Sequence, residues 1–570
     1  MRGRGIAAFA AHTIAATVFV FGSICAFAQN PADVVPRTEE LKKELREALP
    51  QEKAPQLPAQ PIPKELGKPS EELHIDVTGF HVTGLSEAPA EPIEKLLQKF
   101  VGKQRTYEDL SNAAAAVTEY VQRELGYYLG YAYLPEQTPQ DGVIEIRVLE
   151  GRLDQVILNW QENSIVRRSV IEKHVSQLQP GTILRVRDVE RMVFLLNDLL
   201  GLTARVEVRA GRTPGTASLV VTPLAEPRFT GQVGADNFGS RYSGEYRASA
   251  GLLINSPLGL GDGLSINGMV STTGGTLFGL INYTVPIGGS GLKAGLSISQ
   301  LNYKLDKDAF PIGLEGDTTA YSGFVLYPFI RSRNLNLFGQ ATYDYKLYTD
   351  KQTTLSLQND KTVYDYQVGL VGDFRDSLLG GAISTFSAVG EQGHVSLDNP
   401  ALGLDNAPNF TKFLLGFSRL QGIVPNRLLL LMRYQGQIAL DNLDTTERIG
   451  IGGPNAVRAY APGEASADSA HVLTAELRAP LPENWGTWAR EMMASTFFDW
   501  GFAIFRHDTS RQPTTFDNNQ YLAGGGLGLV WERPRNFTAR ASVAWRTTQP
   551  GVSDPGDRLP RVYASFNKIF

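Results

Sequence analysis

The amino-acid sequence predicts a transmembrane β-barrel of about 16 antiparallel strands, preceded by two small α+β modules and a short helix. Three observations support this prediction. Beyond residue 226, apolar and polar side chains alternate over segments of about ten residues, separated by Gly, Asn, Asp and Pro. Between residues 72 and 225, one order of strands and helices occurs twice. Residues 1–28 have the features of a signal peptide.

The expected signal peptide has a positive start, an apolar centre and a cleavage site. Arg2 and Arg4 precede a mostly apolar stretch, and Ala26-Phe-Ala28 is an A-x-A cleavage site. The only cysteine, Cys25, lies inside this segment, so the mature chain is expected to form no disulfide. No later run reaches the roughly 18 apolar residues of a transmembrane helix. A mature protein that spans a membrane must then do so as a closed barrel.

Residues 29–50 are expected to contain a short charged helix with one narrow apolar stripe. Thr38 is a plausible N-cap, Pro50 ends the segment, and the stripe consists of Leu41, Leu45 and Leu49. Two interpretations are open: a frayed surface helix, or a removable plug for a wet lumen. Residues 51–71 are a proline-rich linker, which at about 3.1 Å per residue reaches roughly 60 Å.

Residues 72–151 and 152–225 are expected to be two copies of one α+β unit. In the first copy, Thr106 opens a helix as a capping box, and that helix stops at Gly126. The other elements expected there are a strand at His74–Gly84, a helix near Ile93–Val101, and strands at Tyr127–Leu134 and Val143–Leu149. The second copy is expected to contain a strand at Leu153–Trp160, a helix capped by Ser164 and ending near Leu178, a helix at Asp188–Leu200, and strands at Leu202–Val208 and Ala217–Val221.

Residues 226–570 have the alternation of an outer-membrane barrel with a polar interior. Leu292, Ala294, Leu296 and Ile298, for example, alternate with Lys293, Gly295, Ser297 and Ser299. A barrel of this size is wide enough to need a plug or a gate. The final strand places Phe566 and Phe570 on one face, although Lys568 lies between them.

One glycine-rich stretch carries a single arginine, and a later strand carries a single acid. Arg458 lies in Ile451–Tyr460, and Asp499 lies in Phe497-Phe-Asp-Trp-Gly501. Because a lone buried charge is unfavourable, the two are expected to form a buried pair. The residues of this candidate site are Gly452, Gly453, Val457, Arg458 and Tyr460 in the loop and Phe497, Asp499 and Gly501 in the strand.

Several classes of function are disfavoured. The net charge of −5 argues against a nucleic-acid partner. Gly259–Gly263 and Gly524–Gly526 do not open helices, so they are expected to be barrel turns or strand kinks rather than phosphate loops. The seven histidines are scattered and no Ser/His/Asp arrangement stands out. No catalytic residue, no metal site and no cofactor is expected.

The two α+β copies resemble POTRA domains. The resemblance rests on Gly79-Phe80, Gly126-Tyr-Tyr, Val148-Leu-Glu-Gly151 and the stretch Leu195–Gly201. It implies that the copies hold unfolded polypeptides by adding a strand to an exposed sheet edge. The alternative is a generic α+β spacer.

The arrangement as a whole resembles the two-partner secretion transporters (TpsB family; haemolysin and filamentous haemagglutinin secretion-activation type). Val457-Arg-Ala-Tyr460 resembles the V-R-G-Y/F tip of their inward-folded sixth loop, and Phe497-x-Asp499-x-Gly501 resembles the strand that receives it. Asn255–Asp262 resembles a recurrent barrel turn. The resemblance implies that Arg458 and Asp499 meet inside the lumen. Ala459 replaces the family glycine, and if that position needs a positive φ, the alanine costs about 1 kcal/mol.

The resemblance also implies a location and partners. The barrel would lie in the outer membrane of a Gram-negative bacterium, in contact with lipid, with its POTRA domains in the periplasm. It would export an unfolded, β-rich partner such as an adhesin, a haemolysin or a contact-dependent toxin. The barrel-assembly machinery would recognise Phe566 and Phe570. The alternatives are an outer-membrane protein insertase, whose better-known members carry more than two POTRA domains, and a passive porin.

Overall fold

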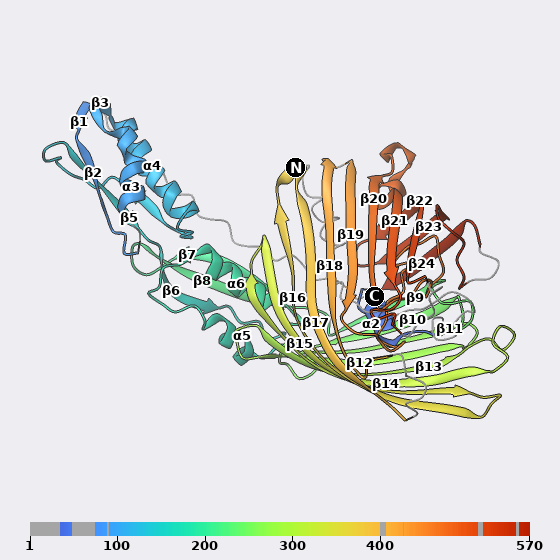
Figure 1. The fold of residues 1–570 in the computed structure, drawn as a ribbon. Coiled ribbons are helices and arrows are strands. Elements are labelled where there is room, and N and C mark those ends of the chain that lie inside the picture. Colours follow the sequence, from blue (N-terminus) through green and yellow to red (C-terminus); the bar gives the residue numbers. More distant parts are fainter. Residues whose placement is uncertain are drawn as a thin grey trace.

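The computed structural model describes residues 35–47, 74–87, 90–398, 406–425, 427–510, 517–553 and 558–570. The expected signal peptide and the proline-rich linker lie outside these residues. Figure 1 shows a wide barrel with a helix, α2, inside it and an arm of two small α+β modules on one side. Among the described helices, none is long and apolar enough to cross a bilayer.

Sixteen antiparallel strands close the barrel, which confirms the predicted fold class and strand number. Each strand pairs with the next along the chain, and Ser565–Ile569 of the last strand pairs with Asp236–Gln232 of the first. The strands are β9 (Phe229–Asp236), β10 (Arg247–Asn255), β11 (Gly263–Ser271), β12 (Thr276–Ile287), β13 (Leu292–Lys304), β14 (Leu314–Arg331), β15 (Leu335–Gln352), β16 (Leu357–Asp376), β17 (Ala382–Leu397), β18 (Asn409–Val424), β19 (Leu428–Ala439), β20 (Ser469–Pro480), β21 (Met492–Ile504), β22 (Asn519–Arg533), β23 (Phe537–Arg546) and β24 (Arg561–Ile569).

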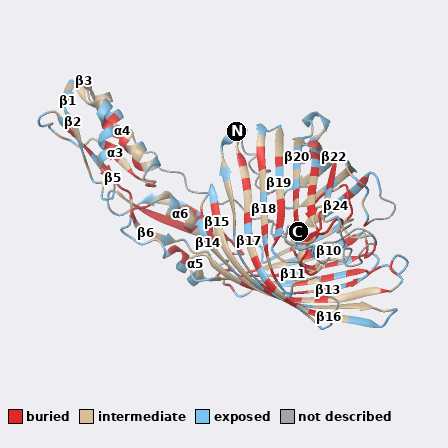
Figure 2. Cartoon of the chain, viewed as in Figure 1, coloured by how far each residue is buried: buried red, intermediate tan, exposed pale blue. Residues whose placement is uncertain are grey.

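The alternation along each strand separates an apolar outer face from a polar lumen. In β15, Tyr343, Tyr345 and Leu347 are exposed on the outside, whereas Asp344 and Lys346 are buried inside. Figure 2 shows the same alternation of buried and exposed residues along the strands. Because neighbouring side chains of a strand point to opposite faces, this pattern places outward-facing and lumen-facing residues as the sequence predicts.

The first module (residues 74–149) contains a break that the sequence did not predict. The expected single strand at His74–Gly84 is two strands, β1 (His74–Val77) and β2 (Gly79–Thr83), separated at Thr78. They bend apart because they have different partners: β1 pairs antiparallel with β3 (Gly102–Thr106), and β2 pairs parallel with β5 (Val143–Leu149). The strand expected at Tyr127–Leu134 is limited to β4 (Tyr131–Tyr133), since the preceding residues form contacts with the second module.

Two helices cover the sheet of the first module. They are α3 (Ala90–Leu97) and α4 (Tyr107–Arg123). The predicted capping box of α4 is confirmed, because the Thr106 hydroxyl accepts from the Asp109 amide and the Asp109 carboxylate accepts from the Thr106 amide. Val117 and Val121 of α4 are fully buried in the core of this module.

The second module (residues 152–225) repeats the plan with one wrong boundary. Its elements are β6 (Arg152–Leu158), α5 (Arg168–Val175), α6 (Val186–Asn197), β7 (Leu202–Ala210) and β8 (Thr216–Ala225), with β8 in the centre of the sheet. The prediction that Ser164 caps α5 is wrong, since the residue before the helix is Arg167. The Ser164 hydroxyl instead donates to the Val166 carbonyl at 2.9 Å, so it stabilises the preceding turn.

The two modules share parts of their hydrophobic cores. Ile183 belongs to the second module but packs in the core of the first, and Tyr128 of the first packs in the core of the second. Backbone hydrogen bonds run from the Tyr128 amide to the Leu184 carbonyl (2.7 Å) and from the Val186 amide to the Gly126 carbonyl (2.9 Å). The modules are therefore interlocked and not simply strung along the chain.

Candidate functional site: the lumen loop and the plug helix

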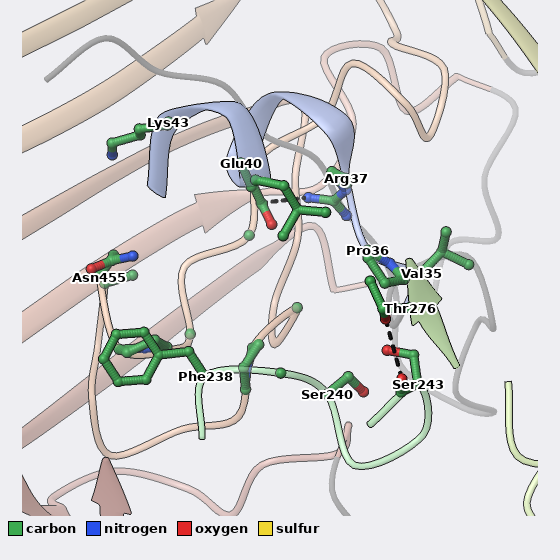
Figure 3. A pocket seen from close by; sticks show the side chains of 18 of the residues that line it. Val35, Pro36, Arg37, Glu40, Lys43, Phe238, Ser240, Ser243, Thr276 and Asn455 are labelled. Carbon is green, nitrogen blue, oxygen red and sulfur yellow. Dashed lines mark hydrogen bonds and ion pairs between the residues drawn. The ribbon is translucent and has the colours of Figure 1, made fainter. Parts of the chain in front are cut away.

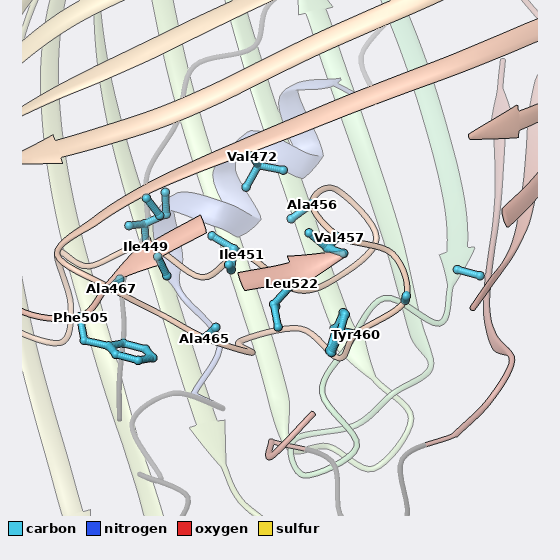
Figure 4. Close-up of a cluster of buried hydrophobic side chains, with 14 of the residues drawn as sticks. Ile449, Ile451, Ala456, Val457, Tyr460, Ala465, Ala467, Val472, Phe505 and Leu522 are labelled. Carbon is cyan, nitrogen blue, oxygen red and sulfur yellow. The ribbon is translucent and has the colours of Figure 1, made fainter. Parts of the chain in front are cut away.

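The loop between β19 and β20, residues 440–468, folds into the barrel and is here named the lumen loop. Its apolar side chains pack against inward-facing residues of the wall, as Figure 4 shows for Ile451 and Val457 beside Leu522. Ile449, Ile451 and Val457 are fully buried. The hydrophobic contact holds the loop against the wall formed by β20, β21 and β22.

Glycine is required at the turn of the lumen loop. Val457 donates its amide to the Ile451 carbonyl at 3.0 Å, which brings the two arms of the turn together. Gly453 adopts a φ of 119°, where an L side chain is strained. A side chain at Gly452 would meet the Ala461 carbonyl oxygen at 2.4 Å.

The structure brings Arg458 and Asp499 together inside the lumen. The Arg458 Nε donates to Asp499 Oδ2 at 2.8 Å, and its Nη2 donates to Oδ1 at 2.9 Å. The Arg458 backbone amide also donates to Oδ2 at 3.2 Å. Asp499 is fully buried, and an isolated carboxylate there would be unfavourable. The bidentate pair places the positive charge of Arg458 next to it.

Glu476 of β20 is a second acidic partner of Arg458 that the sequence analysis missed. Arg458 Nη1 donates to Glu476 Oε2 at 2.9 Å, and Arg478 Nε donates to Glu476 Oε1 at 2.8 Å. The guanidinium also lies 3.3 Å from the centre of the Phe497 ring. The alternation of side chains along β20 could have predicted this partner, because it places Thr474, Glu476 and Arg478 together on the lumen face.

Two neighbouring positions explain how the tip fits the wall. Ala459, which replaces the family glycine, is not among the residues with positive φ, so the strain expected for an alanine there does not arise. Its methyl group faces Gly524, where an added Cβ would lie 2.4 Å away. Gly501 leaves room for Ile451 and Val457 in the same way, since a Cβ added at Gly501 would lie 3.0 Å from each of their side chains.

The lumen loop also binds the last loop, residues 547–560. The Tyr460 hydroxyl donates to the Gln549 carbonyl at 2.8 Å, and beside this loop the Tyr563 hydroxyl of β24 donates to the Tyr460 carbonyl at 2.8 Å. The buried Glu464 carboxylate accepts from the amides of Val552 and Ser553, both at 2.9 Å. The position of the lumen loop therefore fixes part of the last loop as well.

Buried ion pairs hold the base of the lumen loop. Glu447 lies between Lys412 of β18 (2.7 Å) and Lys346 of β15 (3.1 Å), and all three side chains are nearly inaccessible. Asp444 pairs with Lys361 at 3.0 Å. These pairs are not predictable from the sequence, because their members lie far apart in the chain and no local pattern connects them.

Helix α2 (Thr38–Glu47) lies in the lumen, between the lumen loop and the opposite wall. Leu41, only 4% exposed, packs against the inward-facing side chains of Met269, Phe278, Leu280 and Leu301. Lys42 reaches the Ser322 hydroxyl of β14 at 3.5 Å. The Leu45 side chain and Leu49 lie outside the part of the chain that can be described.

Arg37, just before α2, connects the helix to the lumen loop. Its Nη2 donates to the Ser466 hydroxyl at 3.0 Å and its Nη1 to the Arg448 carbonyl at 3.4 Å. Beside this contact is a pocket lined by the start of α2, the loop between β9 and β10, and the tip of the lumen loop (Figure 3). Phe238, Ser240 and Asn455 line it together with Arg37 and Glu40. The helix is thus attached to the lumen loop near Arg37 and borders open space beside it.

The two predicted terminal aromatics lie on the outer face of β24 and just beyond it. Phe566 is 46% exposed and Phe570 is 71% exposed. The Phe570 ring covers Gly231 of β9, where an added Cβ would lie 2.3 Å from the ring. Lys568 forms a hydrogen bond with the Asn536 side chain.

Among the described residues, no group of three or more His, Cys, Asp or Glu is placed to hold a metal ion.

Comparisons with known proteins match both parts of the chain. A model of the haemolysin secretion/activation proteins ShlB/FhaC/HecB matches residues 215–530, and a model of the ShlB-type POTRA domain matches residues 75–151. The heme/hemopexin transporter protein HuxB of Haemophilus influenzae (strain 86-028NP) is 26% identical over 468 residues, which are 80% of this chain and 81% of HuxB. The outer membrane transporter CdiB of Escherichia coli O6:K15:H31 (strain 536 / UPEC) is 25% identical over 70% of this chain and 68% of its own length. The solved structure of CdiB from Escherichia coli superposes with a TM-score of 0.69 at 19% identity, covering 93% of this chain and 95% of that chain.

Proposed function

Because the chain belongs to the ShlB/FhaC/HecB family of haemolysin secretion/activation proteins, we propose that its cargo is a β-rich protein that is exported unfolded and folds outside the cell. As a member of this family, the chain is an outer-membrane transporter of two-partner secretion, which carries a partner protein across the outer membrane. Adhesins, haemolysins and contact-dependent toxins are the cargo classes that we expect.

The occupied lumen is the observation that carries the proposal. Among the described residues, two elements lie in it without contributing a strand to the wall: the lumen loop, which is held by Arg458 and Glu447, and α2, which makes contacts through Leu41 and Arg37. A passive porin needs neither element, whereas an exporter must close its pore when no cargo is present. We propose that α2 leaves the lumen and the lumen loop shifts when the partner enters.

The two modules are the proposed receptor for the partner. We place them in the periplasm, where the unfolded partner arrives. Their sheets have the strand orders β2-β5-β4 and β6-β8-β7, so the edge strands β2, β4, β6 and β7 are the candidates for pairing with an extended chain. Backbone hydrogen bonds at such an edge bind many sequences, which suits an unfolded cargo.

The energy source and the biogenesis follow from the same proposal. No nucleotide motif was found in the sequence, so folding of the partner outside the cell is the proposed driving force, and no catalytic residue or cofactor is assigned. The outer face carries the lipid contacts. Phe566 and Phe570, exposed at the end of the chain, are the proposed signal for the barrel-assembly machinery.

The proposal is tested by co-expression with a large exported protein encoded beside this chain. We expect the partner to appear in the medium or on the cell surface only when this chain is present. The control is the partner expressed alone, which should remain in the periplasm. Retention of the partner in the periplasm, although the barrel is assembled, would contradict the proposal.

A further inference from the structure

The second module contacts three turns at one end of the barrel. The Arg167 amide donates to the Gly259 carbonyl at 2.8 Å, and the Leu200 amide donates to the Gly261 carbonyl at 3.1 Å. Arg191 Nη2 donates to the Ser290 carbonyl at 3.1 Å. These contacts reach the turns after β10 and β12, and the turn after β14 is reached by Glu190, whose carboxylate accepts from the Arg333 amide at 3.4 Å.

A buried ion pair joins α6 and the end of β14. Arg331 Nε donates to Asp198 Oδ2 at 3.0 Å and Nη2 donates to Oδ1, with the side chains only 8% and 7% exposed. Arg331 Nη1 donates to Asn336 Oδ1 at 3.0 Å, and the guanidinium lies over the Phe194 ring at 4.8 Å. Lys293 Nζ donates to the Asp198 carbonyl at 3.0 Å. Residues of the barrel and of the second module thus both contribute hydrogen bonds or ring contacts to the pair.

Glycines on the barrel side allow the close approach. Added Cβ atoms at Gly263, Gly291 and Gly261 would lie 2.3, 2.4 and 2.7 Å from the side chains of Leu200, Leu195 and Leu199, respectively. The connection between the two parts is short, because β8 ends at Ala225 and β9 begins at Phe229. The Glu226 amide also donates to the Gly201 carbonyl at 3.1 Å. No long linker separates the module from the wall.

We propose that the second module is a fixed part of the barrel entrance and not a swinging arm. Asp198 and Arg331 are positioning residues that hold it in one orientation throughout export. The partner chain then passes from module to lumen at a constant angle, and the elements that move are α2 and the lumen loop. This inference rests on the proposed export function.

A reversible covalent lock tests the proposal directly. Leu200→Cys and Gly263→Cys place two thiols across the contact, and Gly263 has no left-handed φ that would oppose the substitution. The sequence has only Cys25, in the expected signal peptide, so no other thiol competes. We expect the oxidised double variant to export the co-expressed partner at the wild-type rate. A block of export that a reductant reverses would overturn the proposal.

A second lock shows whether the assay detects an immobilised element. Leu41→Cys with Phe278→Cys joins α2 to the wall, and its oxidation should stop export reversibly. If the unlocked protein exports nothing, the proposed function itself fails. If it exports and only the module lock blocks it, the fixed-entrance inference fails while the function stands.

Removal of the ion pair tests the positioning residues. Asp198→Ala should lower export at least about tenfold, because it removes the carboxylate that pairs with Arg331 in a buried contact. Barrel assembly, measured by heat-modifiable gel mobility, should persist. The oxidised Leu200→Cys/Gly263→Cys pair should restore export to Asp198→Ala, since it replaces the lost positioning. Wild-type export by Asp198→Ala, or failure of the disulfide to rescue it, would contradict this role.

A matched control lies two residues from Arg331. Arg333 pairs with Glu190 at 4.0 Å across the same contact, but its side chain is 63% exposed. An exposed ion pair adds little stability, so Arg333→Ala should export normally.

Discussion

At the scale of single residues, the site depends on one guanidinium shared by two carboxylates. Asp499 is fully buried and Glu476 nearly so; Arg458 pairs with both, and Arg478 supplies the second positive charge at Glu476. Thr474 donates to Asp499 Oδ1 at 2.9 Å, which fixes the orientation of that carboxylate. Because the hydrogen bonds come from the tip of the loop, they define where the loop binds as well as how strongly.

Arg458→Ala should abolish export while the barrel still assembles. Truncating one member of a buried pair leaves the other charge uncompensated, at a cost of about 3–5 kcal/mol. The secreted partner and the heat-modifiable mobility of the barrel are to be measured together. The control is Arg558→Ala, since Arg558 forms an exposed pair with Glu245. Wild-type export by Arg458→Ala would disprove the role assigned to the loop tip.

Ala459→Gly should change export little. Ala459 does not adopt a positive φ, so the family glycine would relieve no strain and would cost about 1 kcal/mol or less through backbone entropy. Stability is measured by the temperature at which the folded barrel loses its heat-modifiable gel mobility, and this temperature should stay the same or fall slightly. An increase in the transition temperature would show that the alanine is strained after all.

His174 in α5 makes the second module sensitive to acid. Burial lowers the pKa of this imidazole below its ordinary 6.5, although its hydrogen bond with the Val170 carbonyl and the charge of Asp198 act in the opposite direction. Between the lowered pKa and pH 6.5, the unfolded chain binds more protons than the folded one. The free energy of unfolding therefore decreases as the pH falls through this window, and His174 contributes no further loss below it.

Amide hydrogen exchange in α5 measures this effect. After correction for the intrinsic exchange rate, we expect faster exchange at about pH 5 than at about pH 7. The variant His174→Gln should lose this pH-dependent part, because it removes the titrating group. Equal pH dependence in the variant would assign the effect to another group.

At the scale of elements, α2 packs inside the barrel but is not part of its sheet. It has 10 residues, and of its described side chains Leu41 is the one placed in an apolar cluster of the wall. Burying one leucine side chain contributes about 1.5–3 kcal/mol. Since the sixteen barrel strands pair with one another and not with α2, we expect the helix to leave the lumen without disturbing the barrel.

Deletion of residues 31–49 should raise the single-channel conductance in planar bilayers, because it empties part of the lumen. Leu41→Asp should act in the same direction by making the apolar contact unfavourable. Leu41→Met, which nearly conserves volume, is the matched control and should behave as the wild type. Unchanged conductance of the deletion variant would reject the plug.

At the scale of the whole molecule, the arm and the barrel form a continuous body. The first module shares core residues with the second, through Tyr128 and Ile183, and the second is bound to the barrel through Asp198 and Arg331. A substitution in the core of one module is therefore expected to change the packing of its neighbour. The lumen loop and α2 contribute no strand to the barrel and are the elements that we propose to move during export.

Deletion of residues 72–150 should stop export without removing the protein from the outer membrane. The deletion also removes Tyr128 from the core of the second module, so that module should become more sensitive to protease. Export and limited proteolysis are to be measured on the same membranes. Continued export would show that the first module is not needed to receive the partner.

Most of the architecture was predictable, because it depends on local patterns. A period of two over about ten residues predicts a barrel strand wherever the rest of the chain lies. The repeated order of elements predicts two modules, and the capping box predicts the start of α4. The motifs around Arg458 and Asp499 also predicted which two charges belong together. The wrong boundaries, at Thr78, before Tyr131 and at Ser164, occur where a distant partner or a competing hydrogen bond decides the local conformation.

The sequence by itself thus determined the barrel, the two modules and the predicted pair at the tip of the lumen loop. Only the tertiary structure decided that α2 lies in the lumen, that Glu476 shares Arg458, that Glu447 meets two lysines, and that Asp198 meets Arg331. These residues are separated by up to more than one hundred positions, and each has an ordinary local environment in the sequence. The lumen pairs arise because closure of the barrel brings distant strands to one lumen, and Asp198 meets Arg331 because the second module packs on the end of β14; in both places a buried charge is stable only next to its opposite.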